Sequence, residues 1–385
     1  MAHTLRFFAD LCVAGGLVGC AWTLAAALMV RRLRGATATA PRRTAHPAVT
    51  ILKPLCGAEP ELYARMAAFC SQHYRGPLQL VCGVQAPSDP AIELVRKLQA
   101  EFADVPIALH VDGGEHGSNR KVSNLINMLP LAKHDILIMA DSDIVVGPSY
   151  VAQLVGLLDE PSVGAATCLY HGIPDRTGAS RLAALAVNTH FLPQVVMALR
   201  FGLAQPCFGA TITIRREVLR RIGGLRAFTD VLAEDFAIGK AVRAAGYSVS
   251  VSPVSIGHVC VDFGARATLS RQLRVARTIR LIEPVGYAGT VITHPFALAT
   301  LAWLLGASGT GGLIICALAC RIVLCACVQY AFRLPPAPLW LIPLHDLLAF
   351  AIYLASFAGN TVTWRGCRYR VAQDGTMVED AARSA

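Results

Sequence analysis

Long apolar stretches lie near both ends of the chain. Residues 11–30 contain no charged side chain, and twenty mostly apolar residues suffice to cross the hydrocarbon core of a bilayer as a helix. The last third holds three further long apolar stretches, at residues 289–308, about 311–332 and 339–357. Because Arg321 interrupts the second and the glycine-rich residues 306–312 blur its start, the pattern predicts three C-terminal spans, or two with a re-entrant or interfacial segment.

The charges that flank the first apolar stretch predict its orientation. Arg6 and Asp10 precede it, whereas five arginines follow: Arg31, Arg32, Arg34, Arg42 and Arg43. The positive-inside rule then places the N-terminus outside and the following residues in the cytoplasm, as in a multi-pass protein of the plasma (inner) membrane. A cleaved signal peptide is the alternative, but the stretch is longer than an ordinary signal h-region and lacks a clear cleavage site. Two C-terminal spans would keep the basic tail inside, and three would place it outside: Arg365, Arg368 and Arg370.

The pattern changes between about residues 45 and 265. Short β-branched runs alternate there with helical patterns, in the order β-α-β-α-β-α-β from AVTILKPL to DILIMADSD. This alternation predicts an α/β domain with a mainly parallel sheet, in which ligands bind beyond the carboxyl ends of the strands. The predicted domains are an anchor (1–35), an α/β domain (45–265), an Arg-rich interfacial helix (266–288), a membrane region (289–360) and a polar tail (361–385).

Composition supports a membrane protein and narrows its partners. The chain is 54% hydrophobic and only 16% charged, more apolar than a typical soluble enzyme. The net charge of +10 comes largely from arginines near the membrane segments, which favours anionic lipid and phosphates over nucleic acid as partners. The thirteen cysteines are scattered without matched CxxC pairs, so the sequence predicts neither a zinc module nor a disulfide framework.

Two carboxylates follow the apolar run ILIMA at residues 136–140. Asp141 and Asp143 are two positions apart, so in an extended chain both side chains emerge on one side. Hard oxygen ligands of this kind suit Mg²⁺ or Mn²⁺. A turn in which these side chains bind nearby amides is the alternative, but a turn does not need a buried strand before it. Since no Gly-x-Gly-x-x-Gly follows the first strand and no P-loop motif occurs, other groups must hold any phosphate.

Two further polar segments stand next to helical patterns. Glu234 and Asp235 begin one such pattern, where negative charge stabilises a helix start, or where Asp235 could take a proton from an acceptor hydroxyl as a general base. Lys121 and Asn124 lie just before and within another helix, where the segment is either a capping turn or a contact to a donor.

Arginines recur every third residue along residues 270–280. Arg271, Arg274, Arg277 and Arg280 form a stripe on one helical face. A helix lying on the membrane surface explains such a stripe, and so does a clamp on a diphosphate, for which the guanidinium fork is suited. Different arginines can serve the two purposes.

Seven stretches, in this order, resemble one family: ILKPLCGAEPEL, VQAPSDPA, NRKVSNL, ADSDI, GATITIRREVL, LAEDF and RQLR. The chain resembles the ceramide-glucosyltransferase family of membrane-bound inverting glycosyltransferases, whose GT-A fold is an α/β nucleotide-diphospho-sugar transferase domain. It is most similar to the bacterial hopanoid-biosynthesis branch, which also shares RQLR…ARTIR…GY…TH and the RYRV tail. The resemblance extends from about residue 45 to 370.

The resemblance implies a cytoplasm-facing transferase that moves a sugar from a UDP-sugar to a lipid hydroxyl. In the hopanoid branch the donor is UDP-N-acetylglucosamine and the acceptor a hopanoid polyol, whereas the ceramide branch uses UDP-glucose and ceramide. By the same resemblance Asp141 and Asp143 form the metal and diphosphate site, and Asp235 is the general base. Arg271 and Arg274 match the (Q/R)xxRW element, with Arg274 stabilising the leaving diphosphate.

The sequence departs from the family at two positions. The aspartate that usually follows VQ is Ala86, so contact with the donor base passes to Asp89 or a neighbour. The tryptophan after the second arginine is Val275, which puts acceptor preference in question. A processive polysaccharide synthase is the alternative enzyme, disfavoured by Val275 and the few spans. A membrane-anchored lipid or nucleotide binder without activity is the non-catalytic alternative.

Overall fold

The computed structural model describes residues 2–35, 46–175, 177–261, 264–364, 367–372 and 375–379. The chain divides into two compact units. The α/β unit comprises Thr37–Tyr170 and Gln205–Val259, and the helical unit comprises Met1–Ala36, His171–Ala204 and Cys260–Ala385. Of the residues used above to predict orientation, Arg42, Arg43 and Arg365 lie outside the described ranges.

An eight-stranded sheet, in the order β3-β2-β1-β4-β7-β6-β8-β5, is centred on the α/β unit. Its strands are β1 (Val49–Pro54), β2 (Leu78–Val84), β3 (Ile107–Val111), β4 (Ile136–Ala140), β5 (Ile144–Val145), β6 (Val163–Pro174), β7 (Thr211–Arg215) and β8 (Ser248–Cys260). The strands β3, β2, β1 and β4 pair in parallel. Ile51 of β1 lies opposite Leu80 of β2 and Ile138 of β4. The pairs β4–β7, β7–β6 and β8–β5 are antiparallel. The parallel half confirms the predicted alternation of strands and helices.

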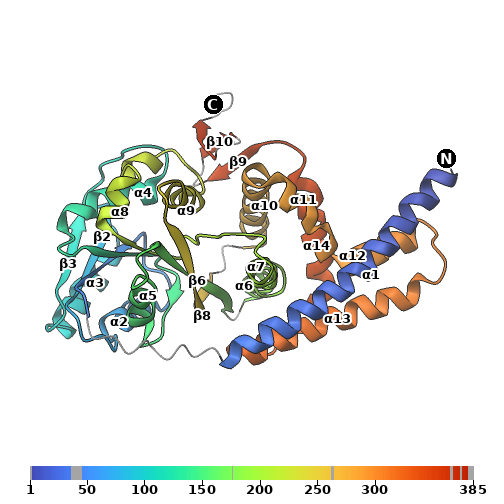
Figure 1. Cartoon of the computed structure of the whole chain (residues 1–385), viewed down its shortest axis with the longest axis horizontal. Coiled ribbons are helices and arrows are strands. Elements are labelled where there is room, and N and C mark those ends of the chain that lie inside the picture. Colours follow the sequence, from blue (N-terminus) through green and yellow to red (C-terminus); the bar gives the residue numbers. More distant parts are fainter. Residues whose placement is uncertain are drawn as a thin grey trace. The chain divides into compact units, whose positions relative to one another are not determined.

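Helices cover both faces of this sheet (Figure 1). They are α2 (Leu62–Cys70), α3 (Ala91–Glu101), α4 (Arg120–Met128), α5 (Tyr150–Leu157), α8 (Arg216–Arg221) and α9 (Glu234–Ala244), with short 3₁₀ turns at Leu129–Leu131 and Leu225–Phe228. Because side chains alternate along a strand, Ile138 packs with α2, α3 and α5, whereas Leu137 and Met139 pack with α4, α8 and α9. Both faces of the central strand β4 are therefore buried, which fixes where its carboxyl end emerges.

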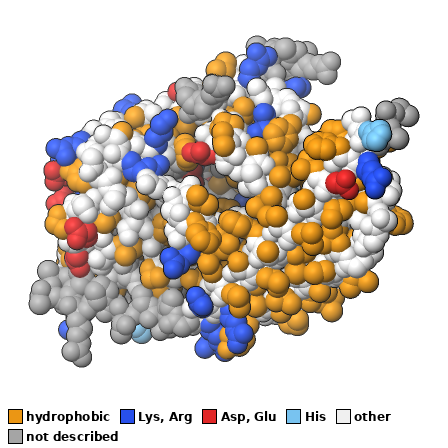
Figure 2. Space-filling model, turned by 45° about the vertical axis from the view of Figure 1, so that its right-hand side comes forward, with side chains coloured by type: hydrophobic (Ala, Val, Ile, Leu, Met, Phe, Trp, Pro, Cys, Tyr) orange, Lys and Arg blue, Asp and Glu red, His pale blue; other side chains and the backbone are white. Residues whose placement is uncertain are grey.

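The helical unit contains the membrane-type segments. Its helices are α1 (Ala2–Arg32), α6 (Gly178–Ala186), a π-helix (Val187–Phe191), α7 (Leu192–Arg200), α10 (Ala265–Ile282), α11 (Pro284–Gly289), α12 (Pro295–Leu304), α13 (Thr310–Phe332) and α14 (Leu341–Ser356), with short 3₁₀ turns at Leu33–Gly35 and Thr290–Thr293. Among the described residues, three helical stretches are long and apolar enough to cross a membrane: His3–Arg32, Gly178–Arg200 and Thr310–Phe332. Figure 2 shows hydrophobic side chains gathered over this part of the surface.

Two details of the predicted membrane region need correction. The stretch at 289–308 is broken: a 3₁₀ turn ends before Pro295, and α12 has 10 residues. At 1.5 Å per residue this helix is about 15 Å long, half of a bilayer core, which favours a re-entrant or interfacial segment there. The sequence did not predict the long apolar helix Gly178–Arg200, because polar residues interrupt its pattern. Residues 171–204, which include it, belong to the helical unit and not to the predicted 45–265 domain.

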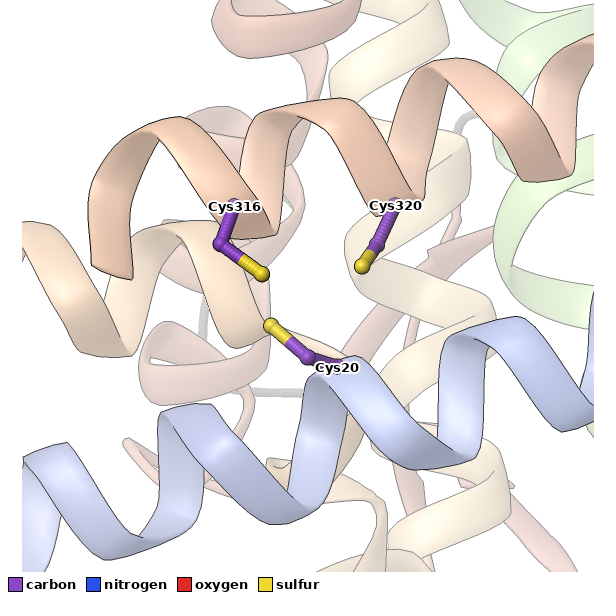
Figure 3. Close-up of side chains that lie close together, drawn as sticks. All are labelled: Cys20, Cys316 and Cys320. Atoms are coloured by element: carbon purple, nitrogen blue, oxygen red, sulfur yellow. The ribbon is translucent and has the colours of Figure 1, made fainter. Parts of the chain in front are cut away.

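Helix α1 packs against α12 and α13 through small side chains. A Cβ on Gly19 would lie 2.3 Å from the carbonyl oxygen of Ile292, so only glycine permits this approach. One residue on, Cys20 faces Cys316 and Cys320, which stand one turn apart on α13 (Figure 3). The three sulfur atoms lie within 4.8 Å of one another.

Arg321, which interrupts the apolar pattern of α13, is 1% exposed and paired inside the helical unit. Its Nε lies 2.7 Å from Asp346 Oδ2 and one of its Nη atoms 2.7 Å from Asp346 Oδ1. The guanidinium also donates to Thr189 in the π-helix. These contacts explain how a charged residue is tolerated within a membrane-type helix. Beyond α14 the described tail forms a small antiparallel sheet, β11-β10-β9 (Met377–Glu379, Cys367–Val371 and Thr361–Trp364).

Candidate active site

The carboxylates of Asp141 and Asp143 stand where the buried strand β4 ends. The N–H of Asp141 donates to the carbonyl of Ala210, 3.2 Å away, which continues the pairing of β4 with β7 for one residue. Ile144 then pairs with His258 in the short ladder between β5 and β8. The side chains of Asp141 and Asp143 remain 31% and 20% exposed, so both can still reach a ligand.

His258 joins this pair through the register of β5 and β8. Its Nδ1 lies 3.4 Å from Asp143 Oδ1. This residue could not be predicted from the sequence, because a lone histidine in an apolar strand belongs to no recognisable motif. The strand pairing that brings it to Asp143 joins segments more than a hundred residues apart. The two carboxylates offer the oxygen ligands that suit Mn²⁺ or Mg²⁺, and the imidazole lies beside them.

Lys121 connects the pair to the start of α9. Its Nζ lies 2.7 Å from Asp141 Oδ1 and 2.9 Å from Glu234 Oε1. Burial opposes the charge on Lys121, but Asp141 and Glu234 outweigh it and raise the pKa of the ammonium above its usual range. Burial raises the pKa of the Asp141 carboxyl, and the charge of Asp143 adds to this while Lys121 opposes it. The site thus concentrates charges of both signs in a poorly solvated place.

Asp235 is held by two backbone amides at the first turn of α9. Its Oδ2 accepts from the N–H of Gly209 at 2.7 Å and its Oδ1 from the N–H of Phe236 at 2.8 Å. Burial and the adjacent charge of Glu234 raise the pKa of the Asp235 carboxyl to about 6, against the opposing effect of Lys121. Glu234 is the opposite case: burial would raise its pKa, but Lys121 outweighs this and lowers it. A carboxylate whose pKa lies just below neutrality is suited to accept a proton.

The side chains of Asn124 and Asp89 form hydrogen bonds with backbone groups. Asn124, in α4, is buried and donates to the carbonyl of Gly83 at 2.9 Å. Both carboxylate oxygens of Asp89 accept from the N–H of Gly57, and Oδ1 also accepts from that of Ala91 at the start of α3. In these contacts Asp89 caps a helix and ties down the loop after β1. Its predicted contact with the donor base stays a prediction.

The arginine stripe lies on α10 of the helical unit and separates into two pairs. The guanidinium of Arg277 donates to the carbonyls of Thr361 and Ala358, and that of Arg280 to Gly359 and Asn360. These two arginines anchor the segment that follows α14, a role that the sequence did not predict. Arg271 and Arg274 make none of these contacts and stay candidates for the diphosphate. Four of the predicted site residues lie in the α/β unit and close to one another: Asp141, Asp143, Lys121 and Asp235.

The chain is similar in sequence to curated ceramide glucosyltransferases. Ceramide glucosyltransferase 1 from Caenorhabditis elegans is 24% identical over 237 residues, covering 61% of this chain and 50% of the relative. Ceramide glucosyltransferase from Candida albicans is 33% identical over 107 residues, or 25% of this chain and 20% of that protein. The chain thus matches about half the length, or less, of these curated relatives.

The fold is also similar to that of a solved structure. The mannosyltransferase PcManGT from Pyrobaculum calidifontis aligns with a TM-score of 0.51 and 19% identity, covering 91% of this chain and 99% of that one. The unit carrying the carboxylates accordingly has a GT-A-like α/β fold. The model of one sequence family, Glycosyl transferase family 21, matches residues 11–377. With nearly the whole chain matched, the protein belongs to glycosyl transferase family 21.

Proposed function

We propose that this protein is an inverting glycosyltransferase that moves a sugar from a UDP-sugar to a lipid hydroxyl, most specifically that of a hopanoid polyol. The observation that carries the proposal is the line of contacts from Asp141 through Lys121 and Glu234 to Asp235. It joins a pair of metal-type carboxylates to a partly buried carboxyl with a pKa of about 6. Sugar transfer requires a stabilised diphosphate leaving group and a base that accepts the proton of the acceptor hydroxyl, and these two groups of residues would provide them.

Asp141 and Asp143, with His258 beside them, are the residues that would hold Mg²⁺ or Mn²⁺. An ion held there would supply positive charge that makes a nucleoside diphosphate a better leaving group. Lys121 adds a second positive charge beside Asp141, and from the motif resemblance we assign Arg271 and Arg274 to the diphosphate as well. PcManGT, the structure similar in fold, was solved with GDP-Man and Mn²⁺.

Asp235 serves as the general base. The amides of Gly209 and Phe236 hold its carboxylate in one orientation, so the lone pairs they leave unused can face the acceptor hydroxyl. Removal of the hydroxyl proton makes the oxygen a nucleophile that attacks the anomeric carbon opposite the diphosphate, which inverts the configuration. Lys121 and Glu234 neutralise each other next to this base, which limits the repulsion that ionised Asp235 must overcome.

A lipid acceptor is supported by the helical unit. Large apolar side chains are exposed along α1 and α13, as expected of surfaces in contact with acyl chains. We propose a multi-pass location in the plasma (inner) membrane with the α/β unit in the cytoplasm. The hopanoid acceptor rests on the motif resemblance, with UDP-N-acetylglucosamine as donor. The names of the curated relatives favour a second candidate, transfer of glucose from UDP-glucose to ceramide.

One reconstitution tests these proposals together. The full chain in nanodiscs is given radiolabelled UDP-N-acetylglucosamine or UDP-glucose, with a hopanoid polyol or ceramide, with and without Mn²⁺. A labelled glycolipid that needs Mn²⁺ supports the function, and the productive pairing identifies donor and acceptor. The absence of glycolipid in every pairing contradicts it. Asp235→Asn should abolish transfer while UDP binding persists, with the exposed Asp104→Asn as a matched control.

A further inference from the structure

The backbone of Asp141-Ser142-Asp143, which we call the DSD loop, is held at each of its three carbonyls. Lys53 Nζ donates to the carbonyl of Asp141. Arg65 Nε donates to that of Ser142 at 3.1 Å. The N–H of Val259 donates to that of Asp143 at 2.8 Å. With its carbonyls engaged, the loop can present its two carboxylates in one direction only.

Two of these three donors are buried cations. Lys53 lies on β1 and is 0% exposed, and Arg65 lies on α2 and is 4% exposed. Burying a charged side chain is costly unless it gains strong partners. Lys53 packs its ammonium 4.1 Å from the centre of the Phe69 ring, and burial lowers its pKa to about 8, so it is still largely protonated at neutral pH. Packing alone would be served better by methionine or leucine at either position.

Arg65 is itself fixed by the loop between β1 and α2. One Nη donates to the carbonyl of Pro60 and the other to Glu59 Oε2, each at 2.7 Å. The guanidinium thus joins Glu59 and Pro60 to Ser142 in the DSD loop, two parts of the chain about eighty residues apart.

We infer that Arg65 and Lys53 are positioning residues, which set the metal affinity of Asp141 and Asp143 by fixing the carbonyls of the DSD loop. This inference rests on the proposed function of that loop. Neither cation needs to touch the metal or the sugar donor. Removing one frees a carbonyl and lets the loop turn, so the two carboxylates no longer meet the ion together. The loss therefore appears as weaker metal binding and not mainly as unfolding.

The test measures Mn²⁺ binding directly, by electron paramagnetic resonance of free Mn²⁺ titrated into the full chain with saturating UDP. Arg65→Met should raise the dissociation constant of Mn²⁺ by about tenfold or more, the effect of losing a hydrogen bond to a charged group. Arg65→Lys should recover part of this, and Lys53→Met, which keeps the apolar stem, should weaken binding similarly. The control is Arg96→Met, which removes an arginine from an exposed ion pair on α3 and should change nothing.

Melting temperature and elution volume are recorded for every variant. Unchanged Mn²⁺ affinity in folded Arg65→Met overturns the inference. If that variant does not fold, Arg65→Lys and Lys53→Met decide in the same way. Wild-type protein that binds no Mn²⁺ with UDP also overturns it. Wild-type protein that binds Mn²⁺ and UDP but forms no glycolipid defeats the proposed function instead, and leaves the positioning role to be judged by the variants.

Discussion

Lys121 and Glu234 form an ion pair, with Nζ and Oε1 2.9 Å apart, directly beside the carboxyl that we assign as the base. Glu234 precedes Asp235 in the chain, and its charge raises the pKa of Asp235, whereas Lys121 lowers it. The pair therefore controls the pH at which Asp235 becomes able to accept a proton. Lys121 also contacts Asp141, so one lysine lies between the proposed metal ligand Asp141 and the residue next to the proposed base.

Glu234→Gln should move the acidic limb of the pH–rate profile to lower pH. In the wild-type protein activity should fall as the pH drops through about 6, where Asp235 becomes protonated. Removing the charge of Glu234 takes away a repulsion and leaves Lys121 paired with Asp141 alone, and both changes stabilise ionised Asp235. The measurement is kcat/KM against pH. The matched control Glu217→Gln, at an exposed position of α8, should leave the limb in place. A limb that stays at its wild-type pH in Glu234→Gln would show that another group titrates.

Gly209→Ala should reduce turnover by about tenfold with little loss of folded protein. A Cβ at this position would lie 3.0 Å from Asp235 Oδ2, so the carboxylate must move from the amide that orients it. A small displacement of a catalytic group is enough for such a loss. Turnover and melting temperature are compared with those of Gly147→Ala, whose added Cβ meets no atom within 4 Å. Equal turnover in the two variants would mean that the amide of Gly209 does not set the base.

Within the α/β unit, the sequence predicted features that have a local pattern better than contacts between distant segments. Asp141, Asp143 and Asp235 could be found because each stands at a strand end or helix start with a local pattern. His258 could not, because only the pairing of β5 with β8 brings it to Asp143. Lys53 and Arg65 were likewise missed, since a charged residue in an apolar run does not reveal that it binds carbonyls distant in sequence.

In the helical unit, long uninterrupted apolar runs predicted the membrane-type helices correctly, whereas a helix interrupted by polar residues was not predicted. The runs at 11–30 and 311–332 lie within long helices, as predicted. The helix Gly178–Arg200 was missed because asparagine, threonine, histidine and proline interrupt its pattern. Several of these polar groups face Arg321 and Asp346, an arrangement that appears only when the helices are packed together.

Breaking the buried pair of Arg321 and Asp346 should destabilise the helical unit strongly. Arg321→Met leaves an uncompensated carboxylate at Asp346, and removing one partner of a buried ion pair typically costs about 3–5 kcal/mol. The double variant Arg321→Met/Asp346→Leu removes both charges and should recover much of that loss. Melting temperature in nanodiscs reports the effect, with Arg333→Met, at the end of α13, as control. If the double variant is no more stable than Arg321→Met, the pair is not what stabilises these helices.

The cysteines shared by α1 and α13 allow the packing of these helices to be tested by oxidation. With three sulfur atoms within 4.8 Å of one another, small rotations bring Cys20 to disulfide distance of Cys316 or Cys320. Copper phenanthroline in native membranes, followed by digestion and mass spectrometry, should therefore yield a peptide in which Cys20 is linked to one of these two. Cys20→Ser should abolish the linked peptide. Cys12, two turns earlier on α1, serves as the internal control and should not link to α13. A link through Cys12 in place of Cys20 would show that α1 meets α13 in a different register.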